Sequence, residues 1–319
     1  MEANGVSDIV TVIQGAVEDI ELPSSDSDIL QSESSDRPTE VIDIIISEWM
    51  GYFLLRESML DSIIRARDKF LKNKTGLMFP SHCTMYVTPV EDEDERRQTN
   101  TEYNNAMGDW SEFAETTRTT YGVDMNCLGP EYQREQKEYY LLSSRWTELS
   151  PNSILAEPQV VKSLDMCTCT IADSRGIEAD APNSHFEFEM KGGDFGNSAN
   201  NVVVSALSGW FTADFKSRTD DLGAQLAPKL SNPAFLSTGP EAGYTHWGQQ
   251  TFYLLSSIPL IQGETCTLKG SIEMMRTKEN ARLYNARIIY ESSRRKSTEP
   301  KNGRILMKGK KQTNIYQIP

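Results

Sequence analysis

The stretch Val41-Ile-Asp-Ile-Ile-Ile-Ser-Glu-Trp-Met-Gly-Tyr-Phe-Leu-Leu-Arg-Glu57 decides the fold of this chain. It opens with a run of β-branched side chains that only Asp43 interrupts. Such a run is typical of a strand buried on both faces inside a parallel sheet. The composition changes abruptly at Ser47, and ligands bind at the loops that follow strands in open α/β sheets. The stretch therefore predicts an α/β domain with a functional loop directly after Ile46.

Two glutamates, Glu48 and Glu57, bracket this loop. Two carboxylates in a partly dry pocket would form a receptor for a guanidinium, whose planar fork of donors matches carboxylate geometry. The alternative is one exposed loop acid and one acid at a helix start, where the helix dipole favours negative charge. The chemistry of these residues alone favours the second interpretation.

The segments around the loop show clear periodicity. Asp8 to Ile13 is predicted as a strand, and Ser24 to Glu40, rich in serine and acids, as a surface loop. Apolar residues then recur at helical spacing from Leu55 to Leu71, and Gly76 follows as a helix-ending residue. Thr84 to Val90 alternates like a strand.

The rest of the chain divides into a polar insert and a β-rich part. Residues 91–158 are polar with isolated aromatic side chains, which predicts a protruding helical arm. From Gln159 onward, short alternating runs separated by Pro, Gly and Asn predict an antiparallel barrel or sandwich. We therefore expect one domain over 1–80 and a second over 81–319, with the arm 91–158 inserted in it.

The charge is uneven along the chain. The net charge is −14, yet residues 292–319 hold eight Lys or Arg against Glu299 alone, so the remainder carries about −21. An acidic body of this kind attracts basic partners and repels nucleic acid. The basic tail is the exception, and an RNA contact there is a weak alternative to a solvated terminus.

Composition also bears on the compartment and on metals. No stretch reaches the length of a membrane span, and the first residues lack a signal-peptide pattern. Five irregularly spaced cysteines favour reduced thiols, so we expect the cytoplasm, with the nucleus as the alternative. Cys167-Thr-Cys169 with three scattered histidines is a poor zinc set, and we predict no metal site.

Two motifs about 190 residues apart resemble those of the protein arginine methyltransferase family. Ser47-Glu-Trp-Met-Gly-Tyr52 with Glu57-Ser-Met59 resembles its double-glutamate hairpin, and Tyr244-Thr-His-Trp247 resembles its Thr-His-Trp loop. The resemblance runs from about residue 3 to Tyr316. It implies a truncated Rossmann-like methyltransferase domain followed by an antiparallel β-barrel with a helical dimerisation arm.

The resemblance also implies roles for single residues. Glu48 and Glu57 would clamp the substrate guanidinium, and His246 would lie close to that pocket. Met50 would shape the pocket as in enzymes that make asymmetric dimethylarginine. Val17 and Glu18 would meet the adenine of S-adenosylmethionine, with Glu18 accepting from its amino group. The reaction would be transfer of a sulfonium methyl to an arginine nitrogen, which needs orientation and electrostatic polarisation.

The resemblance further suggests that catalysis is lost. In the family a glycine-rich turn and a ribose-binding acid precede the segment at Ile9, and only eight residues stand there in this sequence. We therefore expect no cofactor to bind this chain alone, so that the sites named above are vestigial. The sequence resembles the inactive prozyme subunits of kinetoplastid arginine methyltransferases. It would assemble, through the arm 91–158, with a catalytic arginine methyltransferase paralogue and activate or stabilise it.

Two other functions stay open. The chain is either an active type I arginine methyltransferase whose cofactor-binding segment is missing here or supplied in trans, or a non-catalytic binder of arginine-rich tails. Arg56 stands where active family members usually carry an aromatic residue. Its guanidinium would either point outward or pair with a glutamate and occupy the substrate's charge site. The acidic body would help to attract Arg- and Gly-rich protein substrates.

Overall fold

A computed structural model describes residues 1–22, 42–193, 202–218 and 229–319 of the chain. The predicted surface loop 24–40 lies outside the described residues. The α-helices are α1 (Leu60–Phe70), α2 (Glu93–Tyr121) and α3 (Gly129–Leu141). Short 3-10 helices lie at Glu2–Asn4, Asn126–Leu128, Pro151–Ser153, Asp173–Arg175 and Pro240–Ala242.

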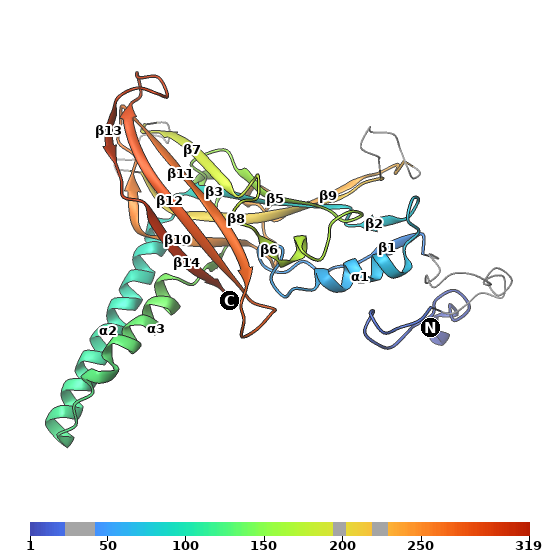
Figure 1. Ribbon diagram of the computed structural model, residues 1–319, viewed down its shortest axis with the longest axis horizontal. Helices are drawn as coiled ribbons and strands as arrows, with labels where there is room; N and C mark the ends of the chain where they lie inside the picture. Colours follow the sequence, from blue (N-terminus) through green and yellow to red (C-terminus); the bar gives the residue numbers. More distant parts are fainter. Residues whose placement is uncertain (23–41, 194–201, 219–228) are drawn as a thin grey trace.

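The described strands number fourteen and fall into a small α/β part and a large β domain (Figure 1). The α/β part holds β1 (Ile44–Ile46) and β2 (Leu77–Phe79). The β domain holds β3 (His82–Val90), β4 (Arg145–Thr147), β5 (Gln159–Asp165), β6 (Gly176–Ile177), β7 (His185–Lys191), β8 (Val203–Phe215), β9 (Ala234–Ser237), β10 (Gln249–Pro259), β11 (Glu264–Arg276), β12 (Tyr284–Lys296), β13 (Ile305–Lys308) and β14 (Gln312–Ile318).

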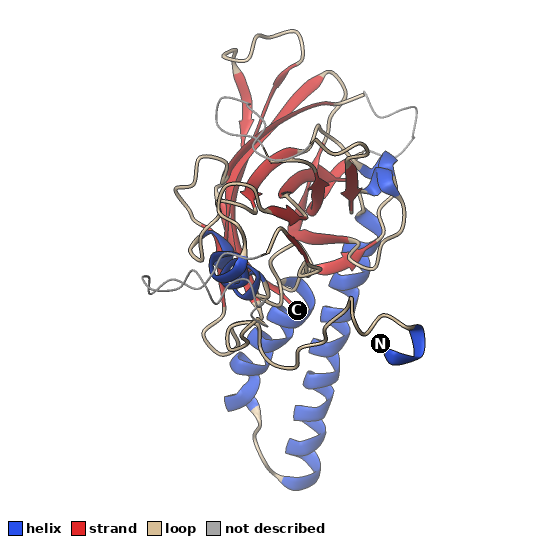
Figure 2. Cartoon of the chain, turned by 90° about the vertical axis from the view of Figure 1, so that its right-hand side faces the viewer, coloured by secondary structure: helices blue, strands red, loops and turns tan. Residues whose placement is uncertain are grey.

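The β domain consists of two antiparallel six-stranded sheets that face each other (Figure 2). One has the order β4-β10-β8-β3-β5 with β9 beside β8, and the other has the order β13-β12-β11-β6 with β14 beside β12 and β7 beside β11. The two sheets are also joined by side-chain hydrogen bonds. Gln159 of β5 exchanges hydrogen bonds with the backbone of Glu187 in β7. The predicted antiparallel β domain is confirmed, with its strands in two facing sheets.

The predicted arm is confirmed as the helical hairpin of α2 and α3, which projects away from the β domain (Figure 1). Its helices pack through aromatic side chains, since Trp110 stacks on Tyr132 with ring centroids 4.6 Å apart. The chain returns from α3 into the β domain through β4, which pairs with β10. The boundary that we placed at residue 80 stays a prediction.

The α/β part differs from the sequence-based expectation in two ways. Residues 8–13 form turns and irregular backbone instead of a strand. β1 is shorter than predicted. Among the residues that the structure describes it pairs only with β2, in parallel register, and Ile44 and Ile46 are 48% and 77% exposed. Both differences have the same cause. A strand needs neighbouring strands to satisfy its backbone hydrogen bonds and to cover its faces, and the described residues provide only β2.

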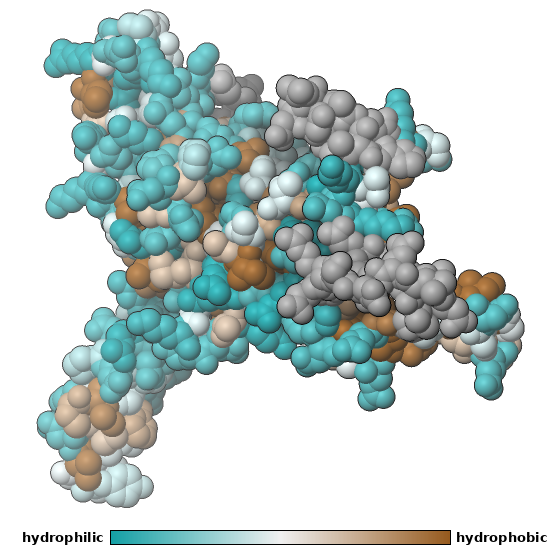
Figure 3. Space-filling model, turned by 45° about the vertical axis from the view of Figure 1, so that its right-hand side comes forward, coloured by the Kyte–Doolittle hydropathy of each residue, from teal (hydrophilic) through white to brown (hydrophobic). Residues whose placement is uncertain are grey.

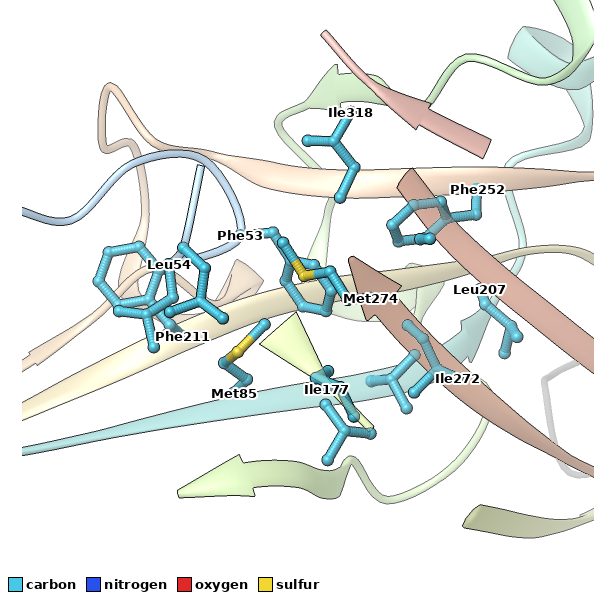
Figure 4. Packing of buried hydrophobic residues seen from close by; sticks show 14 of the residues in the cluster. Phe53, Leu54, Met85, Ile177, Leu207, Phe211, Phe252, Ile272, Met274 and Ile318 are labelled. Atoms are coloured by element: carbon cyan, nitrogen blue, oxygen red, sulfur yellow. The ribbon is translucent and has the colours of Figure 1, made fainter. Parts of the chain in front are cut away.

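A single apolar core joins the two parts. The loop between β1 and α1 inserts Phe53 and Leu54 among side chains of the β domain, including Phe211 and Phe252 (Figure 4). Phe53 lies against Gly209 so closely that a Cβ at that glycine would be 2.4 Å from the Phe53 ring. The loop that carries both glutamates is therefore anchored in the core of the β domain. Among the described helices, none is long and apolar enough to cross a membrane.

Candidate guanidinium site

The loop between β1 and α1, residues 47–59, is named the double-glutamate loop here and has an unusual backbone. Phe53, Leu54, Glu57 and Ser58 all have positive φ, a region that non-glycine residues enter at a cost of about 1–3 kcal/mol each. Gly51 bridges to Leu54, and a Cβ on Gly51 would lie 1.9 Å from the carbonyl oxygen of Arg56. Burial of Phe53 and Leu54 offsets the strain, since each buried large side chain contributes about 1.5–3 kcal/mol.

Glu48 lies at the carboxyl end of β1 with its side chain exposed. Its Oε1 accepts a hydrogen bond from the Met50 backbone N–H at 3.0 Å. The Met50 carbonyl accepts from the indole Nε1 of Trp247 at 2.8 Å, and the Met50 side chain is buried in the core. The two motifs recognised in the sequence are thus in direct contact, and Glu48 is fixed at the junction between them.

Glu57, the second predicted carboxylate, contacts two guanidinium groups of its own chain. Its Oε2 accepts from Arg282 Nη2 at 3.2 Å, and its Oε1 lies 3.6 Å from Arg56 Nη1. The Glu57 backbone N–H also donates to the Arg282 carbonyl at 2.8 Å, which ties the loop to the turn between β11 and β12. The Glu57 carboxylate therefore lies where a guanidinium can pair with it.

Arg56 lies within the site and does not point away from it. Its side chain is 22% exposed, and its guanidinium carbon lies 5.4 Å from the centre of the Tyr52 ring, which suits a cation–π contact. Its Nε is buried without a hydrogen-bond partner among the residues that the structure describes. Of the two orientations considered from the sequence, the structure shows the one in which Arg56 pairs with a glutamate.

The Thr-His-Trp loop forms the other side of the site. His246 is exposed, and its ring lies 3.8 Å, centroid to centroid, from that of Trp247. Trp247 also packs edge-on against Phe211 and donates to Met50, so this loop is held by the core and by the double-glutamate loop together. The structure therefore brings His246 into the neighbourhood of Glu48 through Trp247 and Met50, without a direct contact between the two.

The predicted cofactor residues lie against α1, with contacts to its first and last turns. The Glu18 carboxylate accepts from the Ser62 hydroxyl at 2.6 Å, and its carbonyl accepts from Lys69 at 3.0 Å. The Ser62 hydrogen bond lowers the pKa of Glu18, which therefore stays ionised. An oriented carboxylate with further lone pairs can accept from an exocyclic amino group, so Glu18 fits the predicted adenine contact. Val17 precedes it, partly exposed.

One group of site-supporting residues escaped the sequence analysis. Arg276 of β11 donates to both carboxylate oxygens of Asp61 in α1, at 2.9 and 2.6 Å, and to the Tyr284 hydroxyl at 2.9 Å. Ser58, next to Glu57, lies 3.2 Å from that same hydroxyl. No local spacing pattern in the sequence could reveal these contacts. Ser58 and Asp61 lie more than 100 residues from Arg276 and Tyr284 in the chain.

Other candidate sites are weaker. No group of three or more potential ligands for a metal occurs in the described part of the chain. A hollow of about 560 Å³ on β7, β11 and β12 shares no residue with the double-glutamate loop. In the basic tail, Arg294, Arg295, Lys301 and Lys308 each pair with a glutamate of the β domain, so half of its charge is already neutralised. The RNA contact stays a prediction.

The sequence of this chain is similar to those of known proteins. The family described as the arginine methyltransferase oligomerization subdomain matches residues 81–295. Protein arginine N-methyltransferase PRMT10 of Oryza sativa subsp. japonica is 39% identical over 291 residues, which cover 91% of this chain and 66% of the relative. The PRMT10 of Arabidopsis thaliana is 36% identical over 283 residues, with coverage of 89% and 64%. The chain thus spans about two thirds of the length of these relatives.

Solved structures extend the similarity to the fold. The crystal structure of Arabidopsis thaliana protein arginine methyltransferase 10 aligns with a TM-score of 0.76 and 32% identity, over 100% of this chain and 78% of that one. A chain of the Trypanosoma brucei PRMT1 enzyme-prozyme heterotetrameric complex with AdoHcy aligns with a TM-score of 0.60 over 100% and 76%. At 23% identity, this second likeness concerns the fold alone.

Proposed function

This chain belongs to the protein arginine methyltransferase family, whose members depend on S-adenosylmethionine, and we propose that it carries the arginine-recognition and assembly parts of such an enzyme. The observation that carries the proposal is the Glu57 carboxylate in contact with the guanidiniums of Arg56 and Arg282. A substrate arginine would replace Arg56 at this carboxylate and approach Glu48 from the exposed side of the loop. Charge-assisted contacts of this kind favour arginine over neutral side chains.

The two carboxylates and the surrounding loops have separate tasks in this proposal. Glu48 and Glu57 bind and orient the guanidinium and polarise it, so that one nitrogen faces the methyl donor. Trp247 and Met50 hold Glu48 in place, and Glu18 would accept from the adenine amino group. When bound, S-adenosylmethionine supplies a methyl group on a positively charged sulfur. The relatives named as methyltransferases favour this active function over the inactive one that the sequence first suggested.

The test measures binding of a glycine- and arginine-rich peptide by calorimetry. We expect Glu48→Gln to weaken binding about tenfold, since a charged hydrogen bond contributes about 1.5–3 kcal/mol. The control Glu157→Gln removes an exposed carboxylate elsewhere and should leave the affinity unchanged. The same peptide with lysine in place of arginine should bind more weakly to the unmodified chain. Equal binding by the Glu48 variant and the unmodified chain would contradict the proposal.

A second candidate is the regulatory subunit, and the Arg56–Glu57 contact of 3.6 Å is the feature that favours it. A resident guanidinium at Glu57 would exclude substrate, and the chain would act by assembling with a catalytic paralogue. Methyl transfer to the peptide is measured with the chain alone and after mixing with an active methyltransferase. Activity that appears only on mixing and survives Glu48→Gln favours the regulatory subunit, whereas micromolar binding of S-adenosylmethionine by the chain alone excludes it. Unchanged peptide binding after Arg56→Tyr also counts against it.

A further inference from the structure

The strand through which the arm returns to the β domain also touches the Thr-His-Trp loop. Trp146 lies in the middle of β4 and pairs with Gln250 of β10, three residues beyond the end of that loop. Its indole Nε1 donates to the His246 carbonyl at 3.2 Å. Its ring also lies edge-on to Tyr244, 6.3 Å between centroids. One side chain therefore contacts both Tyr244 and His246 in the segment Tyr244–Trp247.

Gly248 shows how closely the two elements fit. It has φ of +51°, a conformation that glycine adopts readily, and a Cβ there would lie 2.5 Å from Nε1 of Trp146. The indole thus covers the residue directly after Trp247. On the opposite side of the loop, Trp247 donates to Met50 and packs against Phe211. The loop is held between Trp146 outside and the double-glutamate loop inside.

The connection from the arm to Trp146 is short and fixed. α3 ends at Leu141, and the Gln317 backbone N–H of β14 donates to the Leu142 carbonyl at 2.8 Å. The Ser144 backbone N–H donates to the Gln317 carbonyl at 2.8 Å, and the Ser144 hydroxyl donates to Gln250 Oε1 at 2.9 Å. Arg145 also lies 3.5 Å from Glu102 of α2. Few residues between the arm and β4 are free to rotate. A change in the direction of the arm at its base would therefore move β4.

We propose that Trp146 is a positioning residue that holds the Thr-His-Trp loop against Met50 and couples the helical arm to the guanidinium site. The site part of this inference rests on the proposed function. Trp146 touches neither glutamate, and it acts through His246, Gly248 and Trp247. Contact of the arm with another subunit would then change the placement of the loop that fixes Glu48.

The first experiment reads His246 itself. The chain has three histidines, so nuclear magnetic resonance of a histidine-labelled full chain resolves His82, His185 and His246. Trp146→Ala should shift the His246 ring signals and leave the other two in place. Trp110→Ala is the matched control, because Trp110 packs within the arm on Tyr132 and should move none of the three. Unchanged His246 signals in the Trp146→Ala chain would overturn the proposal.

Two further variants separate the parts of the contact. Trp146→Phe keeps the ring against Tyr244 and loses the hydrogen bond to His246, so its His246 shift should fall between those of the unmodified chain and Trp146→Ala. Glu102→Lys places a second cation beside Arg145 at the base of the arm. It should shift the same His246 signals, but by less than Trp146→Ala does. A Glu102→Lys chain with His246 signals identical to those of the unmodified chain would overturn the coupling to the arm.

Peptide binding distinguishes this inference from the proposed function. Trp146→Ala should weaken binding of the glycine- and arginine-rich peptide about fivefold, the factor that one lost hydrogen bond of about 1 kcal/mol corresponds to. Full affinity in that variant overturns the positioning role. If the unmodified chain binds no peptide, the proposed function fails, and the His246 signals still decide whether Trp146 positions the loop.

Discussion

Single residues of the double-glutamate loop are constrained by space more than by charge. Gly51 bridges to Leu54, and four non-glycine residues after it have positive φ. The loop keeps this shape because Phe53 and Leu54 are buried in the core of the β domain. Without the tight turn at Gly51, the strand end with Glu48 and the helix start with Glu57 would separate. The smallest residue of the motif thus determines the placement of its two charged ones.

Gly51→Ala tests this constraint at the residue scale. The added Cβ would lie 1.9 Å from the Arg56 carbonyl oxygen, so the backbone must move. We expect a loss of about 3 kcal/mol or more in the free energy of unfolding, measured by denaturant titration. Gly108→Ala is the matched control, because its Cβ would meet nothing within 4 Å on the exposed face of α2. It should stabilise the chain by about 1 kcal/mol. Equal effects of the two substitutions would refute the constraint.

The attachment of α1 to the β domain depends on a polar network at the scale of elements. Asp61 on α1 pairs through both oxygens with Arg276 of β11, and the side chains are only 22% and 17% exposed. Tyr284 of β12 accepts from Arg276 and donates to the Ser174 carbonyl. Burial alone would raise the pKa of Asp61, but the hydrogen bonds from Arg276 and Ser174 outweigh it and lower the pKa. The carboxylate is therefore ionised when it joins the two parts.

Asp61→Asn should destabilise the chain and change its response to acid. Removing one partner of this half-buried pair loses charged hydrogen bonds, which contribute about 1.5–3 kcal/mol. Because the folded-state pKa of Asp61 is lowered, its contribution is complete above the ordinary value of about 3.9 and is lost as pH falls toward the folded-state pKa. Unfolding free energies measured from pH 7 to 3 should converge for the unmodified chain and the variant at the acid end. Asp68→Asn, at a carboxylate that is 62% exposed, should cost under about 1 kcal/mol.

The whole molecule exposes apolar side chains at two ends. The far end of the arm carries Phe113, Tyr121, Val123 and Leu128, and brown surface is visible there in Figure 3. The α/β part exposes Ile9, Val12, Ile44 and Ile46. Apolar patches of this kind mark surfaces for other chains. Together with the match to an oligomerization subdomain, they support assembly through the arm.

If the chain assembles through the far end of the arm, a charged side chain there should weaken self-association. Val123→Asp combined with Leu128→Asp should raise the dissociation constant of self-association about hundredfold. The reason is that two apolar side chains that become buried on association contribute about 3 kcal/mol or more. Sedimentation velocity over a concentration series measures it. Ile315→Asp is the control, because Ile315 is equally exposed on β14, away from the arm. If the control weakens association as much as the double variant, the arm is not the contact surface.

Much of this protein was predictable from local patterns in the sequence. Alternation of apolar and polar residues predicts β3, β7, β8, β10, β11 and β12, and the polar composition of 91–158 predicts the arm. The motifs around Ser47–Met59 and Tyr244–Trp247 identify both halves of the candidate site. These patterns involve only residues close together in the chain. Backbone geometry fixes the period at which side chains repeat along a helix or a strand, so such patterns can be recognised in the sequence.

Only the tertiary structure decided which distant groups meet. Glu57 contacts Arg282, Asp61 contacts Arg276, and Trp146 covers the loop at His246, each across 100 residues or more. It also decided that residues 8–13 form no strand and that Ile44 and Ile46 are exposed. The physical reason is that strand formation, burial and ion pairing depend on partners brought close by the chain's fold, and a local pattern contains no information on which partners those are.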